Sequence, residues 1–447
     1  MTIGKDGQVT CSVMWFRRDL RLGDNPALLE AAASAETVLP LFVFDPRLWD
    51  PAGSPRQAYL LASIKALGDQ IGGLVVRWGD PAHEVERVVA EVEASSVHIA
   101  ADYDPYGHPR DVEVKQRLEG REVPLARVGS PYAVAPGRVL NQQGNAYQVF
   151  TPFSKVWRDH GWRAPAETRH VSWDHSLESV DLPAVRVPGG MTLPVAGEEA
   201  ALTKWRAFLD GGLATYDVDR NRPDLDGTSR MSVHLKWGEI HPRTMLADLA
   251  QSDAPRKAVD RYRTELAWRE FYADVLARRP DSARDYYRPE LAAMTYDDPG
   301  EQFEAWKDGR TGFPIVDAGM RQLRAEGWMH NRVRMIVASF LVKDLHIEWH
   351  HGARHFLDWL VDGDIASNNH GWQWVAGSGT DAAPYFRVFN PIDQGKKFDP
   401  DGVYIRRYVP ELRDCPLDEL HQPHDPIVDH TEERREALAR YEAVRRA

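Results

Sequence analysis

The chain has 447 residues, of which 43% are hydrophobic and 27% charged, so it is long enough for two or three domains and has the composition of a soluble globular protein. Its net charge of −12, with acidic residues in excess both before and after residue 130, argues against a generally basic nucleic-acid-binding protein, so any DNA site must be a local patch. Two widely spaced cysteines, no apolar run of bilayer length and no apolar signal core predict a cytoplasmic protein without a disulfide framework, a thiolate metal cluster or a membrane contact.

Residues 10–130 alternate between apolar segments rich in β-branched residues and amphipathic segments. We expect strands in the apolar segments at 10–16, 37–44, 73–78, 95–101 and 121–126. We expect helices in the amphipathic segments at 24–35, 56–71, 81–94 and 109–119. This alternation predicts an α/β domain over residues 1–130, with a doubly wound parallel sheet covered on both faces. Neither GxGxxG nor GxxxxGK(S/T) occurs in it, so a phosphate loop is not indicated. The simplest interpretation of Arg17, Arg18 and Arg21 is that they are solvated charges at a strand end, and their segment also belongs to the family resemblance described below.

Residues 131–196 are rich in proline and glycine and have little periodic pattern, which predicts a long connector with one ordered segment at 149–157. From 197 to 447 the pattern is helical, so the second domain is predicted to be all-α. Residues 198–216 predict a single helix, and the charged segment from 430 predicts a terminal helix.

The segment from Trp328 to Trp374 carries polar residues that a plain core helix would not choose. Helical spacing places Asn331, Arg334 and Met335 near one face. Further on, two carboxylates and two amides precede two tryptophans: Asp362, Asp364, Asn368, Asn369, Trp372 and Trp374. Buried acids need partners, and Arg334 is the candidate partner of Asp362. Carboxylate and amide groups among indole rings suit a planar heterocycle with several donors and acceptors at its edge.

Three smaller patterns leave alternatives open. Residues 226–229 predict a turn and a helix start, either as an anion site or as an ordinary Thr or Ser cap. Glu265, Trp268 and Arg269 share a helix face, either around a substrate and a cofactor or as an intrahelical Glu265–Arg269 ion pair. His350, His351 and His355 lack HExxH or cysteine neighbours, so a solvated helix face is favoured and no metal site is predicted.

The segments RTGFPIVDAGMRQLRAEGWMHNRVRMIVASFLVKDL, DGDIASNNHGWQW and GTDAAPYFRVFNP closely resemble the class I photolyase/cryptochrome family. The segment FRRDLRLGDNPAL, which contains the three arginines after the first predicted strand, resembles the opening of the antenna domain of this family. The resemblance covers nearly the whole chain and is strongest from 216 to 398. It implies an antenna-binding domain at 1–130, the connector at 131–196 and a helical FAD-binding and DNA-binding domain at 197–447. It also implies a monomeric enzyme that uses light to split cyclobutane pyrimidine dimers in single-stranded or double-stranded DNA.

A blue-light receptor of the cryptochrome type is the alternative on the same fold. A flavoprotein oxidoreductase that uses NAD(P)H is a third function, but the chain lacks a dinucleotide-binding fingerprint after its first strand.

The resemblance implies the roles of individual residues. The FAD-binding residues would be Tyr216, Thr228, Ser229, Arg230, Met231, Ser232, Arg269, Arg334, Asp362, Asp364 and Asn368. The dimer would contact Glu265, Trp268, Asn331, Met335 and Trp374, and its flanking phosphates Arg220, Arg332 and Arg387. Asn368 would lie at the flavin N5, where asparagine is typical of photolyases rather than cryptochromes. The segment WMHNRVRM fits enzymes for cyclobutane dimers better than those for (6–4) lesions.

Two features depart from the family. The electron relay to the surface would run through Trp372, Trp349 and Tyr296, with tyrosine in place of the outermost tryptophan. His370 stands where many relatives have glycine. For the antenna, residues 106–109 lack the Asn–Glu pair typical of folate binders. An 8-hydroxy-5-deazaflavin or a flavin, with Arg56 as its polar anchor, is therefore favoured over the absence of an antenna, and folate comes last.

Overall fold

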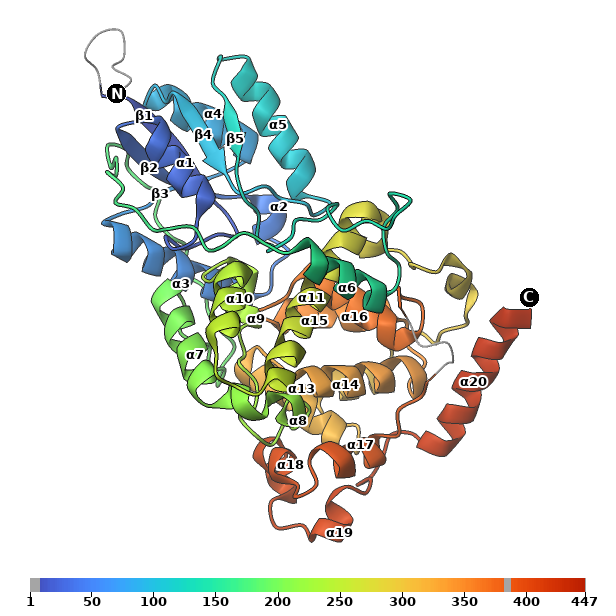
Figure 1. Cartoon of the computed structure of the whole chain (residues 1–447). Helices are drawn as coiled ribbons and strands as arrows, with labels where there is room; N and C mark the ends of the chain where they lie inside the picture. The colour runs from blue at the N-terminus through green and yellow to red at the C-terminus, as the bar shows by residue number, and fades with distance from the viewer. Residues whose placement is uncertain (1–8, 382–386, 447) are drawn as a thin grey trace.

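The computed structural model describes residues 9–381 and 387–446, and Figure 1 shows a sheet-containing part joined to a larger helical part. Five parallel strands form one sheet in the order β3-β2-β1-β4-β5. They are β1 (Cys11–Phe16), β2 (Thr37–Phe44), β3 (Val75–Trp78), β4 (Ser96–Ile99) and β5 (Leu125–Arg127). Each lies within a predicted segment or within one residue of it.

Helices cover both faces of this sheet, as the alternating pattern predicts. On one face α1 (Pro26–Ser34) and α3 (Ser54–Ile71) pack against Met14, Phe16 and Phe42. On the other, α4 (Pro81–Glu91) and α5 (Gly107–Glu119) pack against Val13 and Trp15. The short helix α2 (Pro46–Trp49) follows β2. The strand order reverses between β1 and β4, and in such sheets ligands bind at the carboxyl ends of the strands flanking that point.

The arginines after β1 are not solvated: Arg21 is buried and Arg17 and Arg18 are partly buried, which corrects the sequence interpretation. Arg21 is 3% exposed and donates to the carbonyl of Gly238 over 3.0 Å. The Nη1 of Arg17 donates to Oδ1 of Asp111 over 2.7 Å, and Arg18 reaches the helical part. The strand end lies at an interface, so these charges pair with protein groups instead of water.

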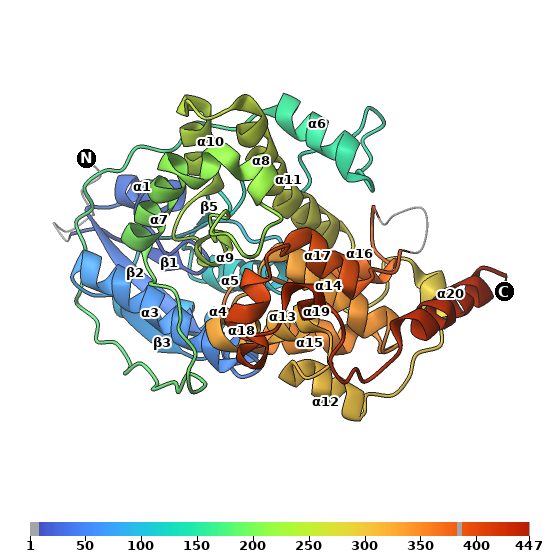
Figure 2. The same ribbon diagram turned by 90° about the horizontal axis from the view of Figure 1, so that it is seen from below.

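The predicted connector has one helix of its own, α6 (Phe150–His160), and otherwise runs as irregular chain along both parts (Figures 1 and 2). Glu270 anchors it: its carboxylate accepts hydrogen bonds from the backbone N–H groups of Ala133 and Val134 and, over 2.6 Å, from Nε1 of Trp157. One buried carboxylate thus holds the start of the connector and α6 against the next domain.

The rest of the described chain is helical. Its α-helices are α7 (Glu198–Asp210), α8 (Tyr216–Asp219), α9 (Ser232–Trp237), α10 (Pro242–Gln251), α11 (Arg256–Arg278), α12 (Glu301–Asp308), α13 (Pro314–Glu326), α14 (Asn331–Lys343), α15 (Trp349–Trp359), α16 (Ile365–Ala376), α17 (Pro391–Phe398), α18 (Val403–Tyr408), α19 (Leu417–Leu420) and α20 (His430–Arg446). Short 3-10 turns are η1 (Gly212–Thr215), η2 (Pro280–Ala283), η3 (Pro289–Ala293) and η4 (Pro410–Leu412).

The single helix predicted over 198–216 is wrong, because α7 ends at Asp210. A Cβ on Gly212 would lie 2.8 Å from the ring of Phe208, so the chain here needs glycine and turns away. Tyr216 therefore begins a separate turn of helix, α8.

The two parts meet at the carboxyl end of β1, where α9 packs closely on the chain. Gly238, which ends α9 with φ 67°, lies so near that a Cβ there would be 2.0 Å from the carbonyl oxygen of Arg18. The backbone N–H of Leu20 donates to the carbonyl of Trp237 over 3.1 Å. This contact places the end of β1 beside the polar segment that precedes α16.

Candidate active site

The predicted pair between Asp362 and Arg334 forms. Nη2 of Arg334, on α14, donates to Oδ2 of Asp362, just before α16, over 2.8 Å. The Nε of Arg334 donates to the carbonyl of Met329 over 2.8 Å, which fixes the guanidinium. The Asp362 side chain is 1% exposed, and its Oδ1 is buried with no hydrogen-bond partner among the described residues. A buried, unpaired carboxylate oxygen suits an N–H donor on a ligand.

Asp364 lies among three cations drawn from both parts of the molecule. Nη2 of Arg18 contacts its Oδ2 at 2.8 Å, and the other oxygen accepts the Ser367 backbone N–H that begins α16. Burial alone would raise the pKa of Asp364, but Arg18, Lys236 and Arg269 lower that pKa well below its usual range. Burial also lowers the pKa of the Lys236 ammonium to about 8, with Arg18 adding to the shift. Asp104 also contacts Arg18, at 3.5 Å, and the three cations supply groups that can bind a pyrophosphate.

Asn368 faces the helix bundle from the first turn of α16. Its Nδ2 donates to the carbonyl of Ala353 over 3.1 Å and to Oδ1 of Asn369 over 2.9 Å. With both amide protons directed at protein, the Oδ1 of Asn368 is the atom left to accept from a ligand. A Cβ added to Gly371, one turn later, would have no other atom within 4 Å, so α16 borders open space here.

The segment from Thr228 to Ser232 does not start a helix where predicted. The helix α9 begins only at Ser232, and its N-terminus has no side-chain cap, so neither the predicted helix start nor the Thr or Ser cap is observed. The Ser229 hydroxyl contacts the Tyr262 hydroxyl at 2.8 Å, and Met231 is buried. Arg230 has φ 52°, and its Nη1 donates to Glu326 over 2.9 Å while the guanidinium lies over Trp328.

Glu265 and Arg269 do not pair with each other. Oε1 of Glu265 lies 3.0 Å from Nη2 of Arg220, which follows α8. Arg269 instead donates to the carbonyls of Pro131 and Leu235, at 3.0 and 3.3 Å. Burial raises the pKa of the Glu265 carboxyl, and the cations Arg220, Arg261 and Arg332 oppose that rise. Tyr216 is also buried. Burial raises the pKa of its phenol, and the nearby charge of Glu265 raises that pKa further.

The other predicted dimer-binding residues line the same region, and all but the exposed Asn331 are partly buried. Asn331 opens α14. Nη1 of Arg332 lies 3.7 Å from the sulfur of Met335. Trp268 stacks on Phe150 with ring centroids 3.7 Å apart and planes 7° apart. Nε1 of Trp374 donates to the carbonyl of Asp381 over 3.1 Å, and the segment 382–386 of the GTDAAPYFRVFNP motif lies outside the described residues.

The three predicted phosphate-binding arginines are neighbours. Burial lowers the pKa of the Arg332 guanidinium, and the nearby charges of Arg220 and Arg387 add to this shift. Nη2 of Arg332 donates to Oδ1 of Asn221 over 2.9 Å. Arg387 is exposed, and its carbonyl accepts a hydrogen bond from the ammonium of Lys343. Together they form a local cationic patch on an acidic protein, as the net charge requires.

The predicted relay residues extend from the core to its edge. Trp372 is 3% exposed and packs against α15, where a Cβ on Gly352 would be 2.2 Å from its ring. Trp349, at the start of α15, is fully buried. Tyr296 is half-buried and lies near Tyr286, a residue that the sequence did not single out.

His370 is buried and hydrogen-bonded on both ring nitrogens. Its Nε2 is 2.9 Å from the Ser282 hydroxyl and its Nδ1 is 2.8 Å from the carbonyl of Ala366. Burial lowers the pKa of the imidazole to about 4, so the ring is neutral near pH 7. This residue joins α16 to η2.

No group of three potential metal ligands occurs within the described ranges. The predicted solvated histidine face is only partly correct, because His355 is partly buried and burial lowers its pKa to about 3. His351 is exposed. Across the residues that the structure describes, no helix combines the length and apolar character required to span a bilayer.

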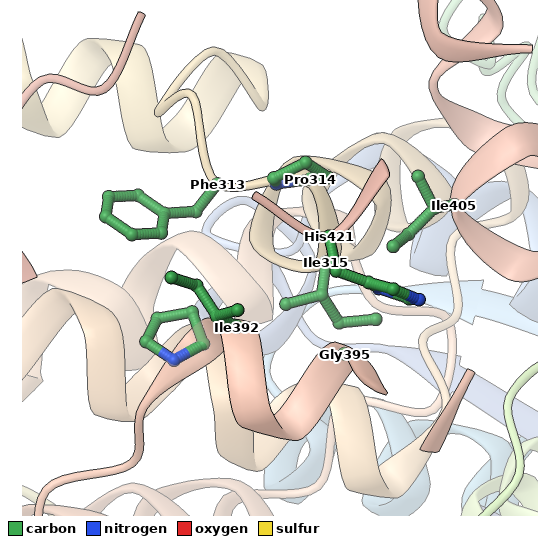
Figure 3. Close-up of a pocket in the computed structure, with 8 residues that line it drawn as sticks. Phe313, Pro314, Ile315, Ile392, Gly395, Ile405 and His421 are labelled. Carbon is green, nitrogen blue, oxygen red and sulfur yellow. The ribbon is translucent and has the colours of Figure 1, made fainter. Parts of the chain in front are cut away.

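A small apolar pocket lies away from these residues. Figure 3 shows its lining side chains from the starts of α13 and α17, with Ile405 of α18 and His421. None of the predicted site residues lines it. The polar site therefore does not coincide with this pocket.

The sequence interpretation missed several residues of the site. Arg18 and Lys236 surround Asp364, and Phe150 supports Trp268. Arg18 stands in FRRDLRL, where three arginines beside buried strand residues were the available signal. Phe150 and Tyr286 had none, because their roles depend on contacts between distant segments.

Two family models match this chain. One, described as DNA photolyase, covers residues 12–170, and the other, the FAD binding domain of DNA photolyase, covers residues 262–443. A deoxyribodipyrimidine photo-lyase of Halobacterium salinarum is 39% identical over 97% of this chain and 99% of its own length. The chain belongs to the DNA photolyase family, as the sequence motifs predict.

Solved structures agree with this assignment. A bacterial class III photolyase from Agrobacterium tumefaciens is 35% identical, covers 100% of both chains and has a TM-score of 0.91. An archaeal photolyase from Sulfolobus tokodaii with two FAD molecules is 30% identical over 97% of this chain and 100% of its own, with a TM-score of 0.84. The two-part fold, a parallel sheet followed by a helical FAD-binding domain, is thus the fold of this family.

Proposed function

We propose that this protein is a deoxyribodipyrimidine photo-lyase, which uses light to split cyclobutane pyrimidine dimers in DNA. The observation that carries the proposal is the position of Glu265: a half-buried carboxyl beside a patch of three arginines, on the helix that also carries Trp268 and Arg269. A hydrogen-bonding group, an aromatic wall and phosphate-binding cations are what a dimer swung out of DNA requires. The curated relative that shares 39% identity bears the name of this activity.

The residues around Asp362 and Asp364 fit FAD. The unpaired Oδ1 of Asp362 can accept from an N–H of the flavin ring, and Asn368 offers a further acceptor. The cations around Asp364 can hold the pyrophosphate, with the backbone and hydroxyls of the Thr228–Ser232 segment beside Tyr216. When bound and fully reduced, FAD supplies an electron on absorbing light.

Glu265 can act as a hydrogen-bond donor to the dimer. In the structure Arg220 contacts its carboxylate and opposes the rise in pKa that burial causes. If Arg220 turns to a DNA phosphate, the burial effect is less opposed, and the pKa of Glu265 rises further. A protonated Glu265 then donates to a pyrimidine carbonyl and stabilises the negative charge that develops on the dimer.

The remaining residues position the lesion. Enzymes of this type act on nucleotides that have left the base stack. Such enzymes commonly hold the extruded base by stacking it on aromatic or apolar side chains. Trp268, held by Phe150, and Trp374 offer ring faces, while Met335 provides an apolar floor. Asn331 is exposed at the start of α14 and can donate to and accept from a pyrimidine edge. Arg220, Arg332 and Arg387 bind the flanking phosphates.

The proposal extends to the organisation of the protein. We place the antenna domain at 1–130, the connector at 131–196 and the catalytic domain at 197–447. A second chromophore, a deazaflavin or a flavin, would bind at the carboxyl edge of the sheet beside Arg56. The two FAD molecules in the Sulfolobus tokodaii structure support such a site in the family. Arg56 itself donates to the carbonyl of Leu357.

We further propose a monomer that acts in the cytoplasm on dimers in single-stranded or double-stranded DNA. Two free cysteines, Cys11 and Cys415, are consistent with a reducing compartment. The cryptochrome-type receptor is not favoured, because Glu265 and the arginine patch supply lesion-binding groups that a receptor does not need.

A repair assay on defined DNA tests the function. Oligonucleotides with one cyclobutane thymine dimer, one (6–4) lesion or no lesion are incubated with flavin-reduced enzyme in light and in darkness, and products are separated by chromatography. We expect conversion of the cyclobutane dimer in light only, with both other DNAs unchanged. Lack of conversion by reduced enzyme that demonstrably binds the dimer DNA would overturn the proposal.

A further inference from the structure

A tyrosine lies between two residues of the predicted relay. The ring of Tyr286, in the loop between η2 and η3, is 6.1 Å from the ring of Trp349, with the planes at 84°. Tyr286 is only 6% exposed. The phenol of Tyr296 lies near enough to the phenol of Tyr286 for each to shift the pKa of the other. A route from Trp349 to Tyr296 therefore passes through Tyr286.

The phenol of Tyr286 is already hydrogen-bonded to a base. Its hydroxyl donates to Oε1 of Glu348 over 2.7 Å, and Glu348 is the residue immediately before α15. Because a carboxylate can only accept, the single Tyr286 proton lies on this bond. The Glu348 side chain is 36% exposed, so a proton that it receives can pass on to water.

His350 offers a second place for that proton. Its Nδ1 lies 3.3 Å from Oε1 of Glu348, and its ring stacks on Trp349 with centroids 3.8 Å apart. Its Nε2 donates to the carbonyl of Arg284, so the neutral ring carries its proton on Nε2 and leaves Nδ1 able to accept. A Glu348 that has gained a proton can therefore donate to His350.

Trp349 has no comparable outlet. Its Nε1 is buried and has no hydrogen-bond partner within residues 9–381 and 387–446. An oxidised Trp349 thus keeps its proton, whereas an oxidised tyrosine must lose one at once. Burial raises the pKa of the Tyr286 phenol, and Tyr296 and Glu348 add to the rise, so bulk deprotonation before oxidation is disfavoured. Proton loss has to accompany electron loss, and that requires a base in place.

We propose that Tyr286 is the electron donor to oxidised Trp349 and that Glu348 is the base that takes its proton. The proposal rests on the proposed function, because bound FAD would supply the light-generated oxidant for the predicted relay residues Trp372 and Trp349. Trp349 radical cation, Tyr286 phenol and Glu348 carboxylate become neutral Trp349, Tyr286 neutral radical and Glu348 carboxylic acid. Tyr296 then passes its hydroxyl hydrogen atom to Tyr286, so the radical moves outward and Tyr286 is restored.

Flash photolysis of the flavin-loaded full chain tests the step. In wild type we expect a tyrosyl radical to appear as the Trp349 radical cation decays, more slowly in D₂O than in H₂O. Glu348→Gln keeps a hydrogen-bond acceptor but removes the base, so tyrosyl formation should slow on the order of 10²-fold. Tyr286→Phe should leave a long-lived tryptophan radical even though Tyr296 is intact. Tyr287→Phe, the adjacent tyrosine, is the matched control and should behave as wild type.

Electron paramagnetic resonance with ring-deuterated tyrosine identifies the radical independently of any catalysis. The linewidth of the tyrosyl radical signal should change when the wild-type protein contains ring-deuterated tyrosine. The tyrosyl signal should be lost in Tyr286→Phe. Tyrosyl formation at the wild-type rate in Glu348→Gln, or in Tyr286→Phe, would overturn the proposal. Flavin content and circular dichroism check that each variant folds.

Repair by chemically reduced enzyme separates the two proposals. It bypasses the relay, so Tyr286→Phe and Glu348→Gln should repair dimers as wild type does. Normal radical transfer in a protein that repairs no dimer would contradict the proposed function and leave the relay standing. Normal repair with unchanged radical kinetics in both variants would contradict the relay alone.

Discussion

The carboxylate of Asp362 is held on one oxygen only: Nη2 of Arg334 donates to Oδ2 over 2.8 Å, while Oδ1 is buried without a partner among the described residues. This half-satisfied pair links α14 to the start of α16 and presents one acceptor to a ligand. The unpaired Oδ1 of Asp362 is the atom of the site that most clearly lacks a hydrogen-bond donor, and a ligand can supply one.

Asp362→Ala should weaken FAD retention, because it removes that acceptor and leaves Arg334 without its partner. The loss of the pair should also lower the free energy of unfolding by about 1–3 kcal/mol, below the cost for a fully buried pair because the Arg334 side chain is 25% exposed. The ratio of flavin to protein absorbance after gel filtration, and denaturant unfolding, measure the two effects. Undiminished flavin content would refute the role of this pair.

Glu265→Ala should lower the quantum yield of dimer repair with FAD still bound, because the dimer loses a hydrogen-bond donor. One such donor is typically worth about 2.7–4 kcal/mol in ground-state enzymes, and the loss is smaller in a photochemical step that competes with back electron transfer. Glu265→Gln, which keeps a neutral donor, should retain most of the yield. Repair by Glu265→Ala at the wild-type yield would remove Glu265 from the active site.

The same residue predicts a pH dependence. Burial raises the pKa of Glu265, so the protonated form persists to higher pH than in an exposed glutamate and is lost as pH rises through that pKa. The repair yield of wild type should therefore fall as pH rises, while the yield of Glu265→Gln should stay level. Parallel profiles for the two proteins would show that another group titrates.

DNA binding should depend only modestly on salt, because few phosphates contact the patch of Arg220, Arg332 and Arg387. We expect a slope on the order of −2 to −5 in log K against log salt, and a slope weaker by about 1 for Arg332→Ala. Arg354→Ala, an exposed arginine on α15 paired with Asp358, is the control and should leave the slope unchanged. A wild-type slope near −10 would require a basic surface much larger than this patch.

Tyr296→Phe should shorten the charge-separated state and slow reduction of FAD in blue light, because the radical on Tyr286 has no hydrogen atom to take. Burial raises the pKa of the Tyr296 phenol to about 12, so this residue also starts protonated. Tyr296→Trp should restore or raise the rate, and repair by pre-reduced enzyme should be unchanged in both. If Tyr296→Phe photoreduces like wild type, the hole leaves elsewhere, and Trp306, whose ring is 6.1 Å from Trp372, is the next residue to change.

Much of the fold could be predicted because it follows from local pattern. The strands read as apolar β-branched segments between amphipathic helices, and the Asp362–Arg334 pair follows from the need to neutralise a buried acid. The break after Asp210 could not be predicted, because it depends on Gly212 lying against Phe208. A glycine within a helical pattern does not by itself indicate that another side chain lies against it.

The parts of the site that were missed depend on contacts between distant segments. Arg18 lies at the end of β1 and pairs with Asp364 only because α9 docks on that strand end. Tyr286 lies in an irregular loop, and nothing in its neighbours in sequence indicates a ring of Trp349 or a carboxylate of Glu348 beside it. The family motifs identified the central residues of the site, such as Asp362 and Glu265. The surrounding residues, such as Arg18 and Tyr286, could be found only from the structure.

The decay of the excited, fully reduced flavin in the presence of dimer DNA tests the central claim most directly. With saturating oligonucleotide that contains one cyclobutane dimer, we predict a shorter excited-state lifetime than with undamaged DNA, and intact thymines formed in proportion to that shortening. Glu265→Ala should give less product for the same light absorbed. Equal lifetimes with damaged and undamaged DNA, both shown to be bound, would contradict electron transfer from the flavin to the dimer at this site.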